Sequence, residues 1–374
     1  MKGMLKQFAL ALGFLSAASL TAVAADEKKD EKKAAPAWFE SITIKGDFRL
    51  RYDSVDEEGK DIRNRERIRA RLGIEAMVIE DVKFGLEIAT GDGDPVSTNQ
   101  TLSEAASKKP FLLSLAYIDW NPSALKGLHF TAGKIKNPFI NVGDGELIWD
   151  SDLTPEGCAL TYQHPGALSF FVNLADFWVQ ERSSESETYM FGGQAGAKIK
   201  LSDAFQFSIG GGVFSYTDLQ GYPTLYIENK GYGNTLDEAG LYVNDYTLIE
   251  AFMDCAGKVG KLPWAVFGEY VVNNAADTDD DMGYIAGFGL GKCKDPLTFE
   301  FKYNYRHLEK DAVLGIFTYS DFVGGGTDGE GHLMSLGMQA SKNIKMAVNY
   351  QLAKKGIDAE KDFSRLQFDF NFKF

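Results

Sequence analysis

The chain is poor in cysteine and has an acidic balance of charge. Its three cysteines (Cys158, Cys255 and Cys293) are widely spaced, odd in number and too few among 374 residues for a disulfide framework. We therefore expect them to be small, fairly apolar residues in or beside strands. The net charge of −14 argues against nucleic acid as a partner, because phosphate groups require a basic surface.

Motifs for catalysis are also absent. The sequence contains neither G-x-S-x-G nor H-E-x-x-H. Of its four histidines, His164 falls in an expected turn, His332 starts an expected strand, His307 ends one, and His129 has no evident nucleophile beside it. A catalytic site can also assemble from distant strands, but these absences lead us to predict that the chain is not an enzyme and needs no cofactor.

The N-terminal residues have the pattern of an export signal. Lys2 and Lys6 precede an apolar run at 8–20, and small residues follow it. This pattern predicts a cleaved signal peptide at 1–25, whose removal leaves 349 residues with a formal charge of −16. Residues 26–37 are charged and have no apolar face, so we expect a flexible linker there.

Beyond the predicted signal peptide there is no run of roughly 18 apolar residues, so no membrane-spanning helix is expected. Instead, apolar and polar residues alternate along the chain. In the last segment, 363–374, every second residue from Leu366 to Phe374 is apolar and the residues between them are polar. A period of two predicts a β-strand with one apolar and one polar face. A soluble sandwich also contains such strands, so one strand alone does not distinguish a sandwich from a membrane barrel.

The same alternation recurs from Ile42 onward, separated by turn residues. We predict sixteen strands, at residues 42–52, 65–78, 82–90, 112–120, 128–136, 157–163, 167–179, 189–201, 205–217, 245–258, 264–273, 283–292, 297–307, 331–341, 344–353 and 363–374. Their connections alternate between short turns and long loops.

This rhythm predicts an all-β fold, a transmembrane antiparallel up-and-down barrel at 38–374. With an even number of strands, all short turns lie at one end and all long loops at the other, as in outer-membrane barrels. A strand edge cannot stay unpaired in hydrocarbon, so the last strand must pair with the first. A soluble sandwich or propeller explains the alternation, but it explains neither the unequal connections nor the aromatic residues near the turns. These are Trp38, Trp120, Trp264, Phe372 and Phe374.

With these features, the chain resembles the sixteen-stranded porins of Gram-negative outer membranes. The resemblance covers 38–374 and rests on the export signal, the strand and loop rhythm and the terminal Phe374, while segment 133–139 (GKIKNPF) is similar to one found in a group of porins. It implies that Phe374 is part of the signal read by the barrel-assembly machinery. It also implies a homotrimer surrounded by outer-membrane lipid and lipopolysaccharide.

If the apolar faces meet lipid, the polar faces line the lumen. The first two strands then place six arginines on one wall, and the third and last strands add two more basic residues. The predicted pore-lining basic residues are Arg49, Arg51, Arg65, Arg67, Arg69, Arg71, Lys83 and Arg365. An alternative is that these residues are structural and pair with lumenal acids such as Asp47, Glu75, Glu87 and Asp369.

The third long loop is rich in acids. The resemblance implies that this loop folds into the barrel and that its acids face the arginines across the narrowest point, which would create a transverse field acting on ions and dipolar solutes. The predicted constriction acids are Asp144, Glu146, Asp150, Asp152 and Glu156.

Acidic residues also cluster in a later loop, at Asp277, Asp279, Asp280 and Asp281. Carboxylates in such a cluster can bind Ca²⁺ or Mg²⁺ and bridge lipopolysaccharide. The alternative is a solvated loop without a ligand.

Together these patterns predict a porin of the cell outer membrane that passes small hydrophilic solutes and ions down their gradients. Two alternatives stay open. One is a channel selective for an anion or a sugar. The other is a non-conducting structural or adhesin barrel with a plugged lumen.

Overall fold

The computed structural model describes residues 41–374 except 104, 165, 167 and 203. The predicted signal peptide, the linker and Trp38 lie outside these residues. In the part of the chain that is described, no helix is long and apolar enough to cross a membrane.

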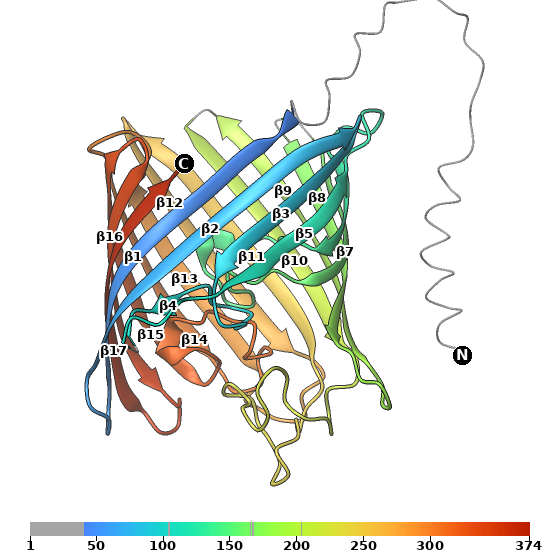
Figure 1. Ribbon diagram of the computed structural model, residues 1–374, viewed down its shortest axis with the longest axis vertical. Helices are drawn as coiled ribbons and strands as arrows, with labels where there is room; N and C mark the ends of the chain where they lie inside the picture. The colour runs from blue at the N-terminus through green and yellow to red at the C-terminus, as the bar shows by residue number, and fades with distance from the viewer. Residues whose placement is uncertain (1–40, 104, 165, 167, 203) are drawn as a thin grey trace, which may run out of the picture. The chain divides into compact units, whose positions relative to one another are not determined.

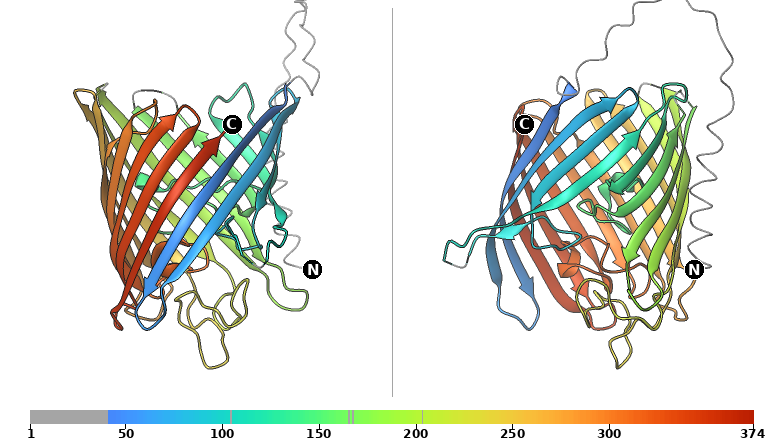
Figure 2. Two further views of the ribbon diagram at one scale, coloured as in Figure 1. Left: turned by 60° about the vertical axis from the view of Figure 1, so that its left-hand side comes forward. Right: turned by 45° about the vertical axis from the view of Figure 1, so that its right-hand side comes forward.

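Sixteen long antiparallel strands form one closed ring, which confirms the predicted barrel (Figures 1 and 2). They are β1 (Thr43–Glu57), β2 (Arg63–Ile79), β3 (Val82–Thr90), β5 (Phe111–Trp120), β6 (Leu128–Lys134), β7 (Glu156–Gln163), β8 (Leu168–Gln180), β9 (Thr188–Ser202), β10 (Phe205–Tyr216), β11 (Thr247–Val259), β12 (Leu262–Asn273), β13 (Met282–Gly291), β14 (Phe299–Leu308), β15 (Gly329–Ser341), β16 (Ile344–Lys355) and β17 (Lys361–Lys373). Each long strand pairs with the next one along the chain.

Three short elements lie in the loops. The two-residue strand β4 (Gln100–Thr101) pairs with β2 beyond the end of β3, through Arg67 and Ile68. The 3-10 helices are η2 (Val142–Asp144) and η3 (Phe322–Gly324).

The barrel closes where β17 pairs with β1. Leu50 lies opposite Phe370, and Arg51 lies opposite Asp369. At the end of this seam Gly46 and Phe374 exchange two backbone hydrogen bonds, each of 3.1 Å. No residue with a side chain fits at Gly46 without a shift, because a Cβ there would lie 2.3 Å from the Phe374 ring. The prediction that the last strand pairs with the first is therefore confirmed.

The two faces of the barrel wall differ as the alternation predicts. On β17, Phe368 and Phe370 are each 40% exposed, while Gln367 and Asp369 between them are buried. An exposed apolar band is unusual for a surface in water, but it suits hydrocarbon.

The connections differ from the prediction in one respect. Loops 91–110, 135–155, 217–246 and 309–328 are long, and we call them loops 2, 3, 5 and 7 after their order at the loop end of the barrel. The connections 58–62, 181–187 and 356–360 at the same end are as short as the turn 121–127 at the turn end. Strands at these places continue past the polar residues at which we expected them to end.

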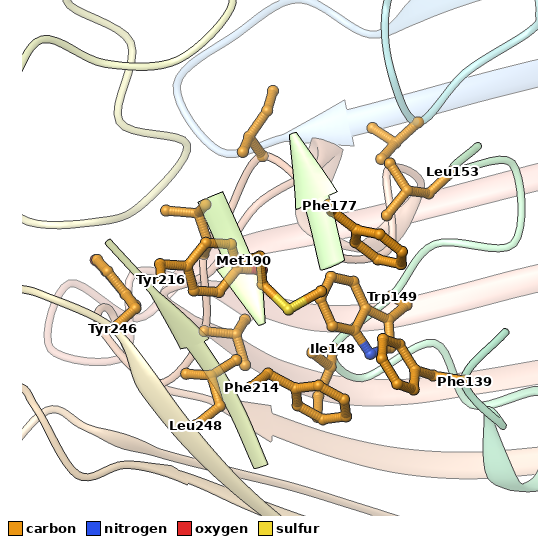
Figure 3. Packing of buried hydrophobic residues seen from close by; sticks show 14 of the residues in the cluster. Phe139, Ile148, Trp149, Leu153, Phe177, Met190, Phe214, Tyr216, Tyr246 and Leu248 are labelled. Carbon is orange, nitrogen blue, oxygen red and sulfur yellow. The ribbon is translucent and has the colours of Figure 1, made fainter. Parts of the chain in front are cut away.

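The interior is less polar than the alternation implies. The inner faces of β8 to β14 carry apolar side chains that pack against loops 3, 5 and 7. Members of this apolar lumen cluster include Phe139, Trp149, Phe177, Met190, Phe214, Tyr246, Leu248 and Val313 (Figure 3). Loops that fold inward provide these side chains with an apolar environment, and a period-two pattern alone cannot reveal this.

Candidate pore wall and constriction loop

Seven arginines line one wall of the interior, and we call them the arginine wall. They are Arg49, Arg51, Arg65, Arg67, Arg69, Arg71 and Arg365. Antiparallel pairing brings them together, because Arg49 lies opposite Arg69 and Arg51 opposite Arg67, while β17 adds Arg365 from the other side of β1. The sequence pattern therefore placed these residues on one surface.

Carboxylates from β1, β17 and loop 7 form ion pairs with two of these arginines. Arg51 donates to both oxygens of Asp369, over 2.6 and 2.8 Å, and to Asp321 of loop 7 over 2.7 Å. Arg365 donates to Asp53 over 2.6 and 3.2 Å and lies 2.8 Å from the second oxygen of Asp321. All five groups are at most 8% exposed, so each charge depends on its partners.

Asp321 links loop 7 to the wall. Burial by itself would raise the pKa of this carboxyl, but the guanidinium groups of Arg365 and Arg51 hold its pKa well below the usual range. Asp321 therefore stays ionised and ties the loop to β1 and β17.

Three further arginines of the wall, Arg65, Arg69 and Arg71, pair with carboxylates in the same way. Asp47 accepts hydrogen bonds from Arg69 over 3.0 Å and from Arg71 over 2.7 Å, and Arg65 donates to Asp53. Asp47 and Asp369 are two of the four acids that the structural alternative names as partners, and both contact arginines. Of the other two acids in that alternative, Glu75 pairs with Lys45 and Glu87 accepts from Ser114.

Loop 3 lies inside the barrel and reaches two separate parts of its wall. Near its start, the backbone N–H of Ile140 donates to Gln194 of β9 over 2.8 Å, and the carbonyl of Gly145 accepts from Arg306 of β14. Trp149 then packs into the apolar lumen cluster, with its ring 5.2 Å from that of Phe214 (Figure 3).

The far end of loop 3 meets the arginine wall through Asp152. This carboxylate lies 3.5 Å from Arg69 and 3.4 Å from Arg71, and it accepts from Thr98 of loop 2 over 3.2 Å. One of the five predicted acids therefore contacts the arginines directly, and a constriction between them stays a prediction.

The other four predicted constriction acids have different surroundings. Asp144 pairs with Lys302 of β14 over 2.6 Å, and Glu156 on β7 pairs with Lys134 over 3.2 Å. The carboxylates of Glu146 and Asp150 instead accept backbone N–H groups within and beside the loop. Burial raises the pKa of Glu146 to about 7 and raises that of Asp150 well above its usual range.

Lys83 lies nearer the turn end than the arginine wall. Its ammonium group is 3.4 Å from Asp119, which also accepts from His129 over 3.0 Å. These residues line a cavity of ≈ 660 Å³ together with residues from the start of loop 3. Lys83 is thus a lining residue of the interior, but it is not part of the arginine wall.

Two buried carboxylates escaped the sequence reasoning. Glu250 of β11 and Glu269 of β12 are each 4% exposed inside the barrel. Gln194 donates to Glu250 over 2.9 Å, and the carboxyl groups of Glu250 and Glu269 contact each other, while no other side chain among the described residues donates to Glu269. Alternation places both side chains on inner faces, but each stands among apolar residues of its strand, and no sequence signal marks it.

The acidic loop 274–281 is not gathered into a metal centre. In the part of the chain that the structure describes, no three His, Cys, Asp or Glu side chains are placed to hold a metal ion. Asp280 instead pairs with Lys310 over 3.3 Å. Cation binding by these acids stays a prediction.

Comparisons with known proteins agree with this architecture. A family model described as putative porin matches residues 56–239 and 250–374. No curated protein matches the chain. Among solved structures, OprB of Pseudomonas putida has a TM-score of 0.60 at 13% identity, over 90% of this chain and 95% of that one. OmpF of Salmonella typhi, solved in complex with daunomycin, has a TM-score of 0.51 at 12% identity, over 88% and 97% of the two chains. At these identities the similarity concerns the fold alone.

Proposed function

Because the chain belongs to the family described as putative porins and is an outer-membrane porin by family and fold, we propose that it forms a water-filled channel for small hydrophilic solutes and ions. Selectivity arises where solutes pass along the arginine wall beside its contact with loop 3. The family and the fold favour a channel over an enzyme.

The contact of Asp152 with Arg69 and Arg71 carries this proposal, because it places opposite charges at the point where loop 3 meets the wall. Fixed charges with low-dielectric surroundings focus the field in a narrow passage. The wall has seven guanidinium groups, and among the residues that the structure describes five carboxylates contact it directly, namely Asp47, Asp53, Asp152, Asp321 and Asp369. Anions should therefore pass more readily than cations.

The surroundings of the channel follow from the exposed apolar band. We propose that outer-membrane lipid covers it, with lipopolysaccharide in the outer leaflet, and that the chain is exported by its signal peptide, assembled through its Phe374-terminated last strand and trimerised. A homotrimer would cover part of the same band.

A second candidate is a non-conducting barrel, which the apolar lumen cluster favours because loops 3, 5 and 7 fill part of the interior. Conductance of purified protein in a planar bilayer separates the two candidates. Stable channels with a linear current at low voltage support the porin. A protein that inserts and stays silent supports the structural barrel.

A further inference from the structure

Two arginines of the wall have no counter-ion. Asp47, Asp53, Asp152, Asp321 and Asp369 together engage Arg51, Arg65, Arg69, Arg71 and Arg365. Among the described residues, neither Arg49 nor Arg67 forms an ion pair, and the buried Nε of each lacks a hydrogen-bond partner. Arg49 donates only to the neutral side chain of Asn99, over 2.6 Å.

The two unpaired arginines are neighbours. Since Arg49 lies opposite Arg69 and Arg51 lies opposite Arg67, Arg49 and Arg67 are diagonal neighbours on one face of the β1–β2 pair. Diagonal positions are about 7–8 Å apart, which two arginine side chains can bridge by converging on one small group.

A cavity of ≈ 420 Å³ gives access to Arg67 from the loop end, whereas its diagonal neighbour Arg49 does not belong to the lining. Arg67 lines it, together with Ser97 and Ser320. Its basic lining residues are Lys60, Arg63, Arg65, Arg67, Lys355 and Arg365, and its acidic ones are Glu57, Asp61, Asp94 and Asp321. The lining is thus basic by two charges, in a chain that is acidic overall.

The acids beside the cavity are already engaged or turned to other groups. Glu57 lies 2.9 Å from Lys60 and 3.3 Å from Lys355. Asp94 accepts from the backbone of Val96, and its burial raises the pKa of its carboxyl. Neither carboxylate is within ion-pairing distance of Arg67. The other two acids near it, Asp53 and Asp321, already pair with Arg51, Arg65 and Arg365.

We infer that Arg67 at the loop-end cavity, supported by its diagonal neighbour Arg49, forms a binding subsite for a small oxyanion, the carboxylate or phosphate group of a solute. The inference rests on the proposed channel and names the class of solute that it concentrates. The guanidinium fork matches the oxygens of both groups, and a half-buried guanidinium without a counter-ion gains from such a ligand. The hydroxyl of Ser97 lies in the same lining and adds a donor.

Anion block of the current tests this subsite. Chloride current through single channels is measured while inorganic phosphate or succinate is added on either side. Saturable block by both solutes identifies the shared oxyanion chemistry, and block by one alone names its source. A charge-assisted hydrogen bond is worth about 1.5–3 kcal/mol, so Arg67→Gln should raise the half-blocking concentration about tenfold or more. Arg49→Gln should act in the same direction.

Lys355→Gln is the matched control, because it removes the same charge from the same cavity at a residue that Glu57 already neutralises. It should leave the half-blocking concentration within about twofold of wild type. If neither solute blocks an open channel, or if all three variants shift the block equally, the subsite is overturned while the porin function stands.

A direct binding measurement separates the subsite from the channel function. Broadening of the phosphate phosphorus resonance by detergent-solubilised barrel should be strong for wild type and for Lys355→Gln, and weak for Arg67→Gln. If the protein proves silent in bilayers, this broadening still decides the subsite, and its absence overturns the inference. Heat-modifiable electrophoretic mobility shows whether each variant retains the folded barrel.

Discussion

The guanidinium of Arg51 on β1 holds the carboxylate of Asp369 on β17 by two hydrogen bonds, of 2.6 and 2.8 Å, across the seam that closes the barrel. These residues stand 318 positions apart in the chain and directly opposite each other in the register. The same pair therefore belongs to the closure of the barrel and to the arginine wall, so stability and selectivity are coupled there.

Asp369→Asn should destabilise the barrel. It leaves Arg51 buried with one remaining carboxylate, and removing one partner of a buried ion pair costs about 3–5 kcal/mol. Urea unfolding in detergent, followed by tryptophan fluorescence, should show a lower midpoint. Asp362→Asn on the same strand is the control, because its pair with Lys354 is exposed and its loss should leave the midpoint unchanged. Equal effects of the two substitutions would contradict a structural role for the seam pair.

Trp149→Ala should release loop 3. The side chain is 1% exposed and packs on Phe139 and Phe214, and truncating a buried tryptophan costs about 3–5 kcal/mol. Amide hydrogen exchange in loop 3 should accelerate and single-channel conductance should become larger and noisier. Trp178→Ala removes the same ring from an outer face, where it is 57% exposed, and should change neither. An unchanged loop in Trp149→Ala would refute its anchoring role.

Glu146 should make the seating of loop 3 depend on pH. Burial raises its pKa to about 7 in the seated loop, against about 4.3 when solvated. The neutral form is therefore favoured in the seated loop. The full stability is present below the solvated pKa and is lost as the pH rises through about 7, by up to about 4 kcal/mol. Asp150 contributes in the same direction.

Hydrogen exchange in loop 3, corrected for the intrinsic rate, should therefore accelerate between about pH 5 and about pH 8. Glu146→Gln should suppress the part of this change centred near 7. Asp144→Asn, at an exposed acid of the same loop, should preserve it. If Glu146→Gln retains the whole pH response, the titrating group lies elsewhere.

Phe374→Ala should impair assembly more than stability. The ring is 68% exposed, so its removal costs the folded barrel little, whereas the C-terminal aromatic is the group we propose that the assembly machinery reads. The outer-membrane fraction should contain less barrel, while protein refolded in detergent should unfold at the wild-type midpoint. Phe372→Ala, on the same face of β17, is the control and should assemble better than Phe374→Ala. Normal membrane levels of Phe374→Ala would exclude this role.

The alternation of apolar and polar residues predicted the barrel, because a period of two identifies the strands and shows which side chains share a face. The sixteen strands, the closure of β17 on β1 and the gathering of arginines on one wall all follow from it. It could not show that Met190, Phe214 and Leu248 face inward, because an apolar residue suits lipid and an apolar loop equally well. Only the tertiary position of loops 3, 5 and 7 decides between them.

The candidate site shows the same division. Sequence spacing placed Arg49 through Arg71 on one face, but it could not say which of them are neutralised, because Asp321 and Asp152 reach the wall from loops far along the chain. Nor could the sequence distinguish Asp152 from Glu146 in the same acidic loop. Asp152 contacts arginines, whereas Glu146 accepts a backbone N–H group. We propose that these long-range pairs set the field in the lumen.

The reversal potential of the channel under a salt gradient tests the central claim most directly. With Arg65, Arg67 and Arg69 replaced together by Gln, the wild-type preference for chloride over potassium should fall and move toward that of a neutral pore, in a barrel that still migrates as folded. An unchanged reversal potential in the open triple variant would contradict the claim that the arginine wall sets selectivity.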